Sequence, residues 1–167
     1  MSWTSNLRKL HARSWSERVR LIEAFIRLGL MRAALGRWPF RRIAARLGLM
    51  QTETPLVGQV PNIAEATRIG WAVKAAASRT PWPSTCLVQA LAGIMMLRRR
   101  HISGTLYLGV AKDKLGPEQI AAHAWLASGD VVLIGENERE RFKVISCFST
   151  SADRFPRGCG RFSAKKD

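Results

Sequence analysis

The sequence predicts an α+β fold in which N-terminal helices are followed by an antiparallel sheet. Between residues 15 and 99, apolar residues recur mostly at three- and four-residue steps, which is the period of a helix. After Arg98-Arg99-Arg100 the period becomes two, which is typical of strands. With 167 residues, 47% of them hydrophobic, the chain can bury one sizeable core.

Two helices are expected near the N-terminus. Ser14-Trp-Ser-Glu17 has the pattern of a capping box and opens a predicted helix from Trp15 to Leu35. Its apolar positions are Val19, Ile22, Phe25, Ile26, Met31 and Leu35. Trp38-Pro39 breaks this helix, and a short second helix follows from Phe40 to Leu47. The stretch from Met50 to Pro61 reads as a linker because it contains Thr, Gln, Gly and two prolines.

Two further helices are expected before the sheet. Asn62-Ile-Ala-Glu65 is a second capping-box pattern and opens a helix that runs to about Ala77. Pro81-Trp82-Pro83 then favours an extended turn, since each proline biases the residue before it away from the helix. With Ser84 as the expected cap, the next helix runs from Cys86 to about Arg99. Its predicted buried face consists of Leu87, Leu91, Ile94 and Met95.

Four strands are expected after this helix. Residues 106–110 alternate between apolar and other side chains and form the first strand. Ala121–Ser128 and Val131–Glu136 form a hairpin around Gly129-Asp130, with glycine first as a type II′ turn requires. Phe142–Phe148 is the fourth strand.

The composition excludes several classes of protein. The three cysteines lack C-x-x-C spacing and no phosphate-binding loop is visible, so we expect no disulfide framework, no metal and no cofactor. No apolar stretch is long enough to cross a bilayer as a helix, and the N-terminus lacks a secretory pattern, which predicts a cytoplasmic protein. The net charge of +15 favours a nucleic acid, an anionic membrane face or an acidic protein as partner. Without an RNP-like strand, a zinc finger or a recognition helix, we expect no specific nucleic-acid binding.

Cys86 is the first candidate for a catalytic residue. A thiol attacks as its thiolate, and the first turn of a helix stabilises that anion through the helix dipole and the unpaired backbone amides. The same amides are donors for an oxyanion. The alternative is that Cys86 is a small buried residue, which is the usual fate of a free cysteine.

His123 is the candidate base, in the segment Ala122-His123-Ala124-Trp125 of the predicted hairpin. A single histidine in a strand is more often structural. A cysteine at a helix start followed by a histidine on an adjoining sheet is nevertheless the arrangement of papain-like and transglutaminase-like hydrolases. The other candidates carry less weight: His11 and His101 read as solvated, Cys147 as core, Cys159 as a tail thiol, and Trp125 as core or as a wall beside His123.

Turn geometry supplies the third candidate. If Ser128 and Val131 close the turn, the residue directly opposite His123 is Glu136. Directly opposed residues have Cβ atoms about 5 Å apart, so this carboxylate is expected to orient the imidazole by accepting its second N–H. A register slip of one residue would turn Glu136 away and leave it a solvated residue at a strand end.

Several segments together resemble a known family. They are Pro81-Trp-Pro-Ser-Thr-Cys-Leu-Val-Gln-Ala-Leu91, Met96-Leu-Arg-Arg-Arg100, Leu108-Gly-Val110, Ala122-His-Ala-Trp125 and, near the N-terminus, Trp38-Pro-Phe-Arg-Arg42. The sequence resembles the stand-alone leader peptidases of lasso peptide biosynthesis, a branch of the transglutaminase-like cysteine proteases. The resemblance covers most of the chain from about residue 15 to residue 148.

The resemblance implies a transglutaminase-like or papain-like cysteine protease fold, with a helical lead-in over residues 1–60, a catalytic core over residues 61–148 and a basic tail over residues 149–167. Cys86 and His123 fall on the family's nucleophile and base. The family's third member is usually an aspartate, and this chain departs from the pattern because Glu136 stands one residue away from the matching position.

The resemblance also implies a pathway. The enzyme removes the leader from a ribosomally made precursor, so that a cyclase can join the freed core amine to an Asp or Glu side chain. Some members carry a winged-helix leader-binding domain, whose strands the first 60 residues do not show, and a separate leader-recognition protein is therefore expected. Two alternatives stay open: a transglutaminase-type acyl transferase, in which an amine replaces water, and a catalytically inactive scaffold that presents the precursor.

Overall fold

A computed structural model describes residues 14–52, 62–112, 120–137 and 139–150 of the chain. The helices are α2 (Trp15–Arg37), α3 (Phe40–Arg46), α4 (Ile63–Ala77) and α5 (Cys86–Arg99), with a 3-10 turn η1 (Arg139–Arg141). The strands are β1 (Met50–Thr52), β2 (Gly104–Lys112), β3 (Ile120–Ser128), β4 (Val131–Ile134) and β5 (Lys143–Thr150). The expected α+β class, with helices before an antiparallel sheet, is confirmed.

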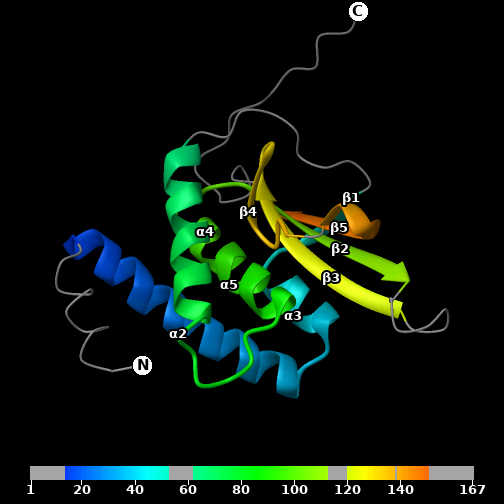
Figure 1. Cartoon of the computed structure of the whole chain (residues 1–167), viewed down its shortest axis with the longest axis horizontal. Helices are drawn as coiled ribbons and strands as arrows, with labels where there is room; N and C mark the ends of the chain where they lie inside the picture. The colour runs from blue at the N-terminus through cyan, green and yellow to red at the C-terminus, as the bar shows by residue number, and fades with distance from the viewer. Residues whose placement is uncertain (1–13, 53–61, 113–119, 138, 151–167) are drawn as a thin grey trace, which may run out of the picture.

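The five strands form one sheet in the order β1-β5-β2-β3-β4, and every neighbouring pair is antiparallel. Figure 1 shows the helices gathered on one side of this sheet. Helix α5 contacts β2, β3 and β4 as well as α2 and α4, so it lies between the sheet and α2, while α4 packs beside it on β4. This central position explains why eight of its 14 residues are buried.

Local capping signals predict the start of α2 correctly and the cap of α4 wrongly. The Ser14 hydroxyl caps α2 by accepting from the Glu17 amide at 3.4 Å. The capping box expected at Asn62 and Glu65 does not form: Asn62 precedes α4 with φ +70° and makes no side-chain cap. The reason is that the Glu65 carboxylate accepts hydrogen bonds from Arg20 of α2 instead.

Helix α2 buries a different face from the one that its large apolar residues suggest. Its buried residues are Ala24, Leu28, Met31 and Ala34. Its exposed apolar residues include Val19, Ile22, Phe25 and Ile26, which the sequence pattern placed on the apolar face. The buried side has small alanines that admit close packing, and it also carries charged residues whose partners lie on α4 and α5.

Strand β1 is an element that the sequence pattern missed, because Met50–Thr52 was expected to begin a linker. The three residues pair with Cys147–Ser149 of β5 at one edge of the sheet. Near the C-terminus, β5 continues to Thr150, so its last two residues lie in the segment that was expected to be a tail. Residues 53–61 and 151–167 lie outside the described part of the chain.

The hairpin of β3 and β4 begins in the predicted register and then shifts. Ser128 pairs with Val131 as expected, and Gly129 in the turn has φ +55°. Ala127 still pairs with Val132, and a bulge then inserts Leu133, so that Leu126 pairs with Ile134 instead. Helix α4 packs directly on this bulge: a Cβ atom at Gly70 would lie 2.7 Å from the Leu133 carbonyl oxygen. The shifted register of β3 and β4 therefore occurs where α4 packs directly on β4.

Two glutamates tie α2, α4 and the end of α5 together. Arg20 donates two hydrogen bonds of 2.9 Å to Glu65, and Arg100 donates a third at 3.1 Å. Arg100 also donates to Glu23 of α2 at 2.8 Å. The hydrogen bonds from Arg20 outweigh desolvation and hold the pKa of the Glu65 carboxyl below its usual range.

Acid is expected to weaken the fold through Glu65. Because the pKa of this carboxyl is lower in the folded than in the unfolded chain, its contribution is present above its ordinary value of 4.5 and is lost as pH falls through the folded pKa. Glu65→Gln should therefore lower the free energy of unfolding near neutral pH by about 1–3 kcal/mol, a difference that shrinks in acid. Urea unfolding across this range tests it, with Glu140→Gln, an exposed carboxylate, as control. A difference that is independent of pH would contradict the prediction.

Within the described residues, none of the helices has the length and apolar character needed to cross a membrane.

Candidate active site at the start of helix α5

Cys86 is the first residue of α5, as the sequence predicts, and its side chain is half-buried. The cap is Thr85 rather than Ser84: the Thr85 hydroxyl accepts from the Val88 amide at 3.5 Å. In any helix, the backbone N–H groups of the first turn have no carbonyl acceptor inside the helix. They lie at the positive end of the helix dipole. The thiol therefore lies beside donors that suit a thiolate or an oxyanion.

The loop before Cys86 is held by one side chain from α5 and one from α2. The side-chain amide of Gln89, one turn into α5, donates to the Ser84 carbonyl at 2.8 Å. The Trp82 ring packs against Phe25 of α2 with centroids 5.2 Å apart. The position of Cys86 therefore depends both on α5 itself and on the packing of its loop against α2.

His123 lies on β3, and its ring packs beside Trp125 and Phe142 at centroid distances of 5.9 and 5.0 Å. Trp125 is only 4% exposed, so it is both part of a buried cluster and a wall beside His123. The Nε2 atom of His123 lies 3.0 Å from the Gly135 carbonyl oxygen. Because a carbonyl oxygen can only accept, Nε2 carries the proton, and in the neutral ring Nδ1 is the nitrogen that can act as a base.

Gly135 is a residue that sequence reasoning missed as part of the site. It follows β4 with φ +79°, a conformation that side chains other than glycine rarely adopt. A Cβ atom here would lie 2.7 Å from the Ala124 carbonyl oxygen and 2.9 Å from the Trp125 Cβ. Only glycine therefore lets the backbone approach β3 closely enough for its carbonyl to reach the His123 ring. The one sequence signal was a glycine directly after a strand and before an acidic residue.

The predicted pairing of Glu136 with His123 is wrong. Strand β4 ends at Ile134, and the bulge at Leu133 shifts the register by one residue before that end. Glu136 is exposed, and the group that the His123 ring contacts is the carbonyl of the preceding residue, Gly135. A catalytic role for the Glu136 carboxylate stays a prediction.

Helix α5 and strand β3 run in the same direction where they pack. Gly93 lies against Leu126, and Leu97 lies against Gly104. Gly104 precedes Thr105, the partner of Ala127, so later residues of α5 lie beside later residues of β3. The start of α5 therefore lies toward the start of β3. Cys86 and His123 are consequently at the same end of this contact.

The two candidates nevertheless point to different faces of β3. Ala124 and Leu126 belong to the core cluster that faces α5. Side chains alternate along a strand, so His123 and Trp125 lie on the opposite face. Among the residues described, no hydrogen bond joins Cys86 to His123, and the two lie toward the same end of the contact between α5 and β3 without forming a dyad.

The remaining candidates fall outside the site. Cys147 is buried, as expected, and burial raises the pKa of its thiol. His101 is exposed, as expected, while His11 and Cys159 lie outside the described residues. In the part of the chain that the structure describes, no group of three or more His, Cys, Asp or Glu side chains could hold a metal ion.

Alkylation is expected to distinguish the two described thiols. Reactivity follows exposure and thiolate content, and Cys147 is buried, has a raised pKa and donates to the Thr52 carbonyl at 2.6 Å. Half-buried Cys86 should therefore react with iodoacetamide at least about tenfold faster than Cys147 in the folded protein. Peptide mapping by mass spectrometry after short exposures measures this, with the chain in guanidinium as the control in which the rates converge. Equal rates in the folded chain would contradict the prediction.

A half-buried thiol at the start of a helix that packs on an antiparallel sheet defines a candidate cysteine-nucleophile enzyme of α+β class. A family model described as the transglutaminase-like superfamily matches residues 27–147, a span that includes both Cys86 and His123. The chain belongs to the transglutaminase-like superfamily, which includes cysteine proteases and acyltransferases. Neither the curated proteins nor the solved structures give a significant match.

Proposed function

We propose that the chain is a cysteine protease that removes the leader peptide from a ribosomally synthesised lasso peptide precursor in the cytoplasm. The observation that carries the proposal is Cys86 at the first residue of α5 in a chain of the transglutaminase-like superfamily. The sequence resemblance to stand-alone leader peptidases supports the finer assignment. In this proposal a separate leader-recognition protein delivers the precursor, and a lasso cyclase takes the freed core peptide.

Cys86 is the nucleophile of the proposed reaction and His123 is the base. The Nδ1 atom of His123 takes the thiol proton, and the thiolate attacks the carbonyl carbon of the last leader residue. Backbone N–H groups at the start of α5 hold the oxyanion. The ring then protonates the leaving amine of the core peptide, and water hydrolyses the thioester to free the leader.

Proton transfer requires Nδ1 of His123 to come within about 3.2 Å of the Cys86 sulfur, and catalytic hydrogen bonds commonly tighten only in the substrate complex. In the described part of the chain, the pairing of β3 with β4 ends at Leu126, and the Gly135 backbone lies beside β3 further toward His123. Because the ring lies on the face of β3 away from α5, we propose that substrate binding rearranges the start of β3 and turns the ring toward the thiol.

Two neighbouring groups compete for the role of third member. The Gly135 carbonyl accepts from Nε2 and so selects the tautomer, whereas the Glu136 carboxylate would in addition stabilise an imidazolium. Glu136→Gln distinguishes them by kcat/KM. If Glu136 is the third member, a loss of about 10⁴-fold is expected, as for removal of a triad carboxylate. A loss of about tenfold or less would assign the role to the Gly135 carbonyl.

The products of a reconstituted reaction test the function. Purified chain, candidate precursor and recognition protein are incubated and analysed by mass spectrometry. Two fragments whose masses sum to the precursor plus one water support leader proteolysis. A product in which an amine has replaced water would instead establish acyl transfer. An intact precursor that the cyclase processes only in the presence of this chain would establish the scaffold alternative and overturn the protease.

A further inference from the structure

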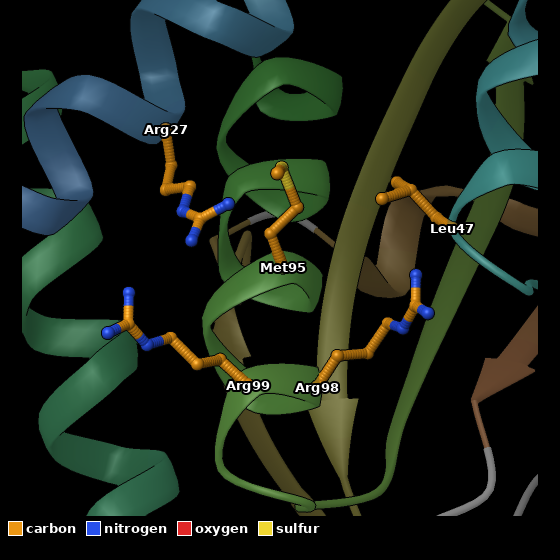
Figure 2. Close-up of a pocket in the computed structure, with 5 residues that line it drawn as sticks. All are labelled: Arg27, Leu47, Met95, Arg98 and Arg99. Carbon is orange, nitrogen blue, oxygen red and sulfur yellow. The ribbon is translucent and has the colours of Figure 1, made fainter. Parts of the chain in front are cut away.

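A basic pocket of about 250 Å³ opens between α2, α3 and α5. It is lined by Arg27, Leu47, Met95, Arg98 and Arg99. Figure 2 shows Met95 between two groups of side chains, with Arg27 and Arg99 on one side and Arg98 and Leu47 on the other. Met95 was expected on the buried face of its helix, so this pocket is a product of the packing of α2, α5 and the end of α3.

Two arginines of the basic pocket, Arg27 and Arg99, are incompletely neutralised. Arg27 and Arg99 approach one carboxylate oxygen of Glu23 at 3.8 and 3.9 Å, beyond hydrogen-bond distance. That oxygen is buried and has no hydrogen-bond partner. The other oxygen of Glu23 accepts from Arg100 at 2.8 Å. One carboxylate therefore faces three guanidinium groups, and neither Arg27 nor Arg99 comes within hydrogen-bond distance of it.

The lining also limits what can bind. Guanidinium groups offer planar, paired donors that match a carboxylate. Leu47 and Met95 add an apolar wall, which a bare inorganic anion would leave without a partner. The volume is below the range of about 300–1,000 Å³ of small-molecule sites, and it suits one or two side chains. The complementary ligand is an acidic side chain next to an apolar one in a peptide.

We propose that the basic pocket binds an acidic residue, with an apolar neighbour, of the leader peptide that Cys86 cleaves. The inference rests on the proposed function for the identity of the peptide. The pocket lies on the same helix as the nucleophile: Met95 and Arg99 are about 14 and 20 Å from Cys86 along α5, at about 1.5 Å per residue. Because α5 is largely buried, an extended peptide that runs around it needs at least roughly four to six residues to cover this distance. The acidic residue therefore lies at least about four residues before the cleavage site.

Peptide binding tests the pocket without requiring turnover. The probes are a fluorescein-labelled peptide that alternates Glu and Leu and the same peptide with Gln for Glu, and the protein is the full chain with Cys86→Ala. Fluorescence anisotropy should show binding of the Glu peptide only. Arg27→Gln and Arg99→Gln should each weaken it by about tenfold, the size expected for one charge-assisted hydrogen bond.

Arg32→Gln is the matched control, because it removes the same charge from an exposed position on α2 outside the pocket. It should change the affinity by less than about twofold. Equal weakening by Arg32→Gln and the pocket variants would overturn the inference, because net charge alone would explain binding. Inorganic phosphate serves as a competitor in a second experiment. If low concentrations of phosphate displace the Glu peptide, and replacing the Leu residues of the peptide does not change its affinity, the inference is also overturned. Thermal melts of each variant verify that the fold is retained.

The two proposals can fail separately. Binding that depends on Arg27 and Arg99, in a chain that cleaves no precursor, leaves the pocket standing and removes the protease. Cleavage whose KM is unaffected by Arg27→Gln and Arg99→Gln removes the pocket and leaves the protease. An increase in KM with kcat unchanged is the expected result, because the pocket lies far from the reacting atoms.

Discussion

Replacing Cys86 with alanine is expected to abolish leader removal, with a loss in kcat/KM of at least about 10⁴-fold. The substitution removes the atom that attacks the peptide, and no other described thiol can replace it, because Cys147 is buried and donates to the Thr52 carbonyl. The measurement is the rate of precursor cleavage with the recognition protein present, followed by mass spectrometry. Cys86 is half-buried, so the variant should fold and can be verified by its thermal melt.

Two controls give this result its meaning. Cys159→Ser removes another thiol of the chain and should leave the rate unchanged. Thr85→Ala removes the cap of α5, whose hydroxyl accepts from the Val88 amide, and should lower the rate moderately by loosening the first turn. Undiminished cleavage by Cys86→Ala would exclude the cysteine mechanism and leave the scaffold as the remaining reading.

Gly135→Ala is expected to damage both stability and activity. The residue has φ +79°, and an added Cβ would meet the Ala124 carbonyl oxygen at 2.7 Å and the Trp125 Cβ at 2.9 Å. Backbone strain and overpacking together should lower the free energy of unfolding by about 2–4 kcal/mol. The shift of the backbone also removes the carbonyl that holds the Nε2 atom of His123, so kcat/KM should fall by more than about a hundredfold in the molecules that remain folded.

Gly48→Ala is the matched control for Gly135→Ala. Gly48 also has a positive φ, +61°, but the nearest atom to an added Cβ lies 3.9 Å away. Its cost is therefore the conformational one alone, about 1 kcal/mol, and activity should be retained. Urea unfolding and steady-state kinetics on both variants measure the difference. Equal costs for the two substitutions would show that close approach at Gly135 does not matter.

Sequence patterns performed well where the cause is local. The bounds of α5 are those expected, since Pro81 and Pro83 prevent an earlier start and the apolar period fits one helix. The cap was displaced by one residue because Ser84 and Thr85 are both competent caps. Only the fold shows that the Ser84 hydroxyl lies 2.9 Å from that of Thr80, which leaves Thr85 to cap the helix.

The third member of the site shows where local reasoning ends. The turn at Gly129-Asp130 was correct, and extending its register placed Glu136 opposite His123. The bulge at Leu133, packed against Gly70 of α4, lies between the turn and the site and shifts that register. A bulge of this kind depends on a contact between residues more than sixty positions apart, which periodicity does not reveal.

The sequence by itself determined the α+β order, the bounds of α5 and the place of Cys86 at its start, because helix breakers, caps and periodicity act over a few residues. The tertiary structure decided the rest. It selected the face of α2 that is buried, diverted Glu65 from a cap to Arg20, and presented the Gly135 carbonyl to His123. Each of these outcomes is a competition between a local partner and a distant one, and only packing sets how close the distant partner comes.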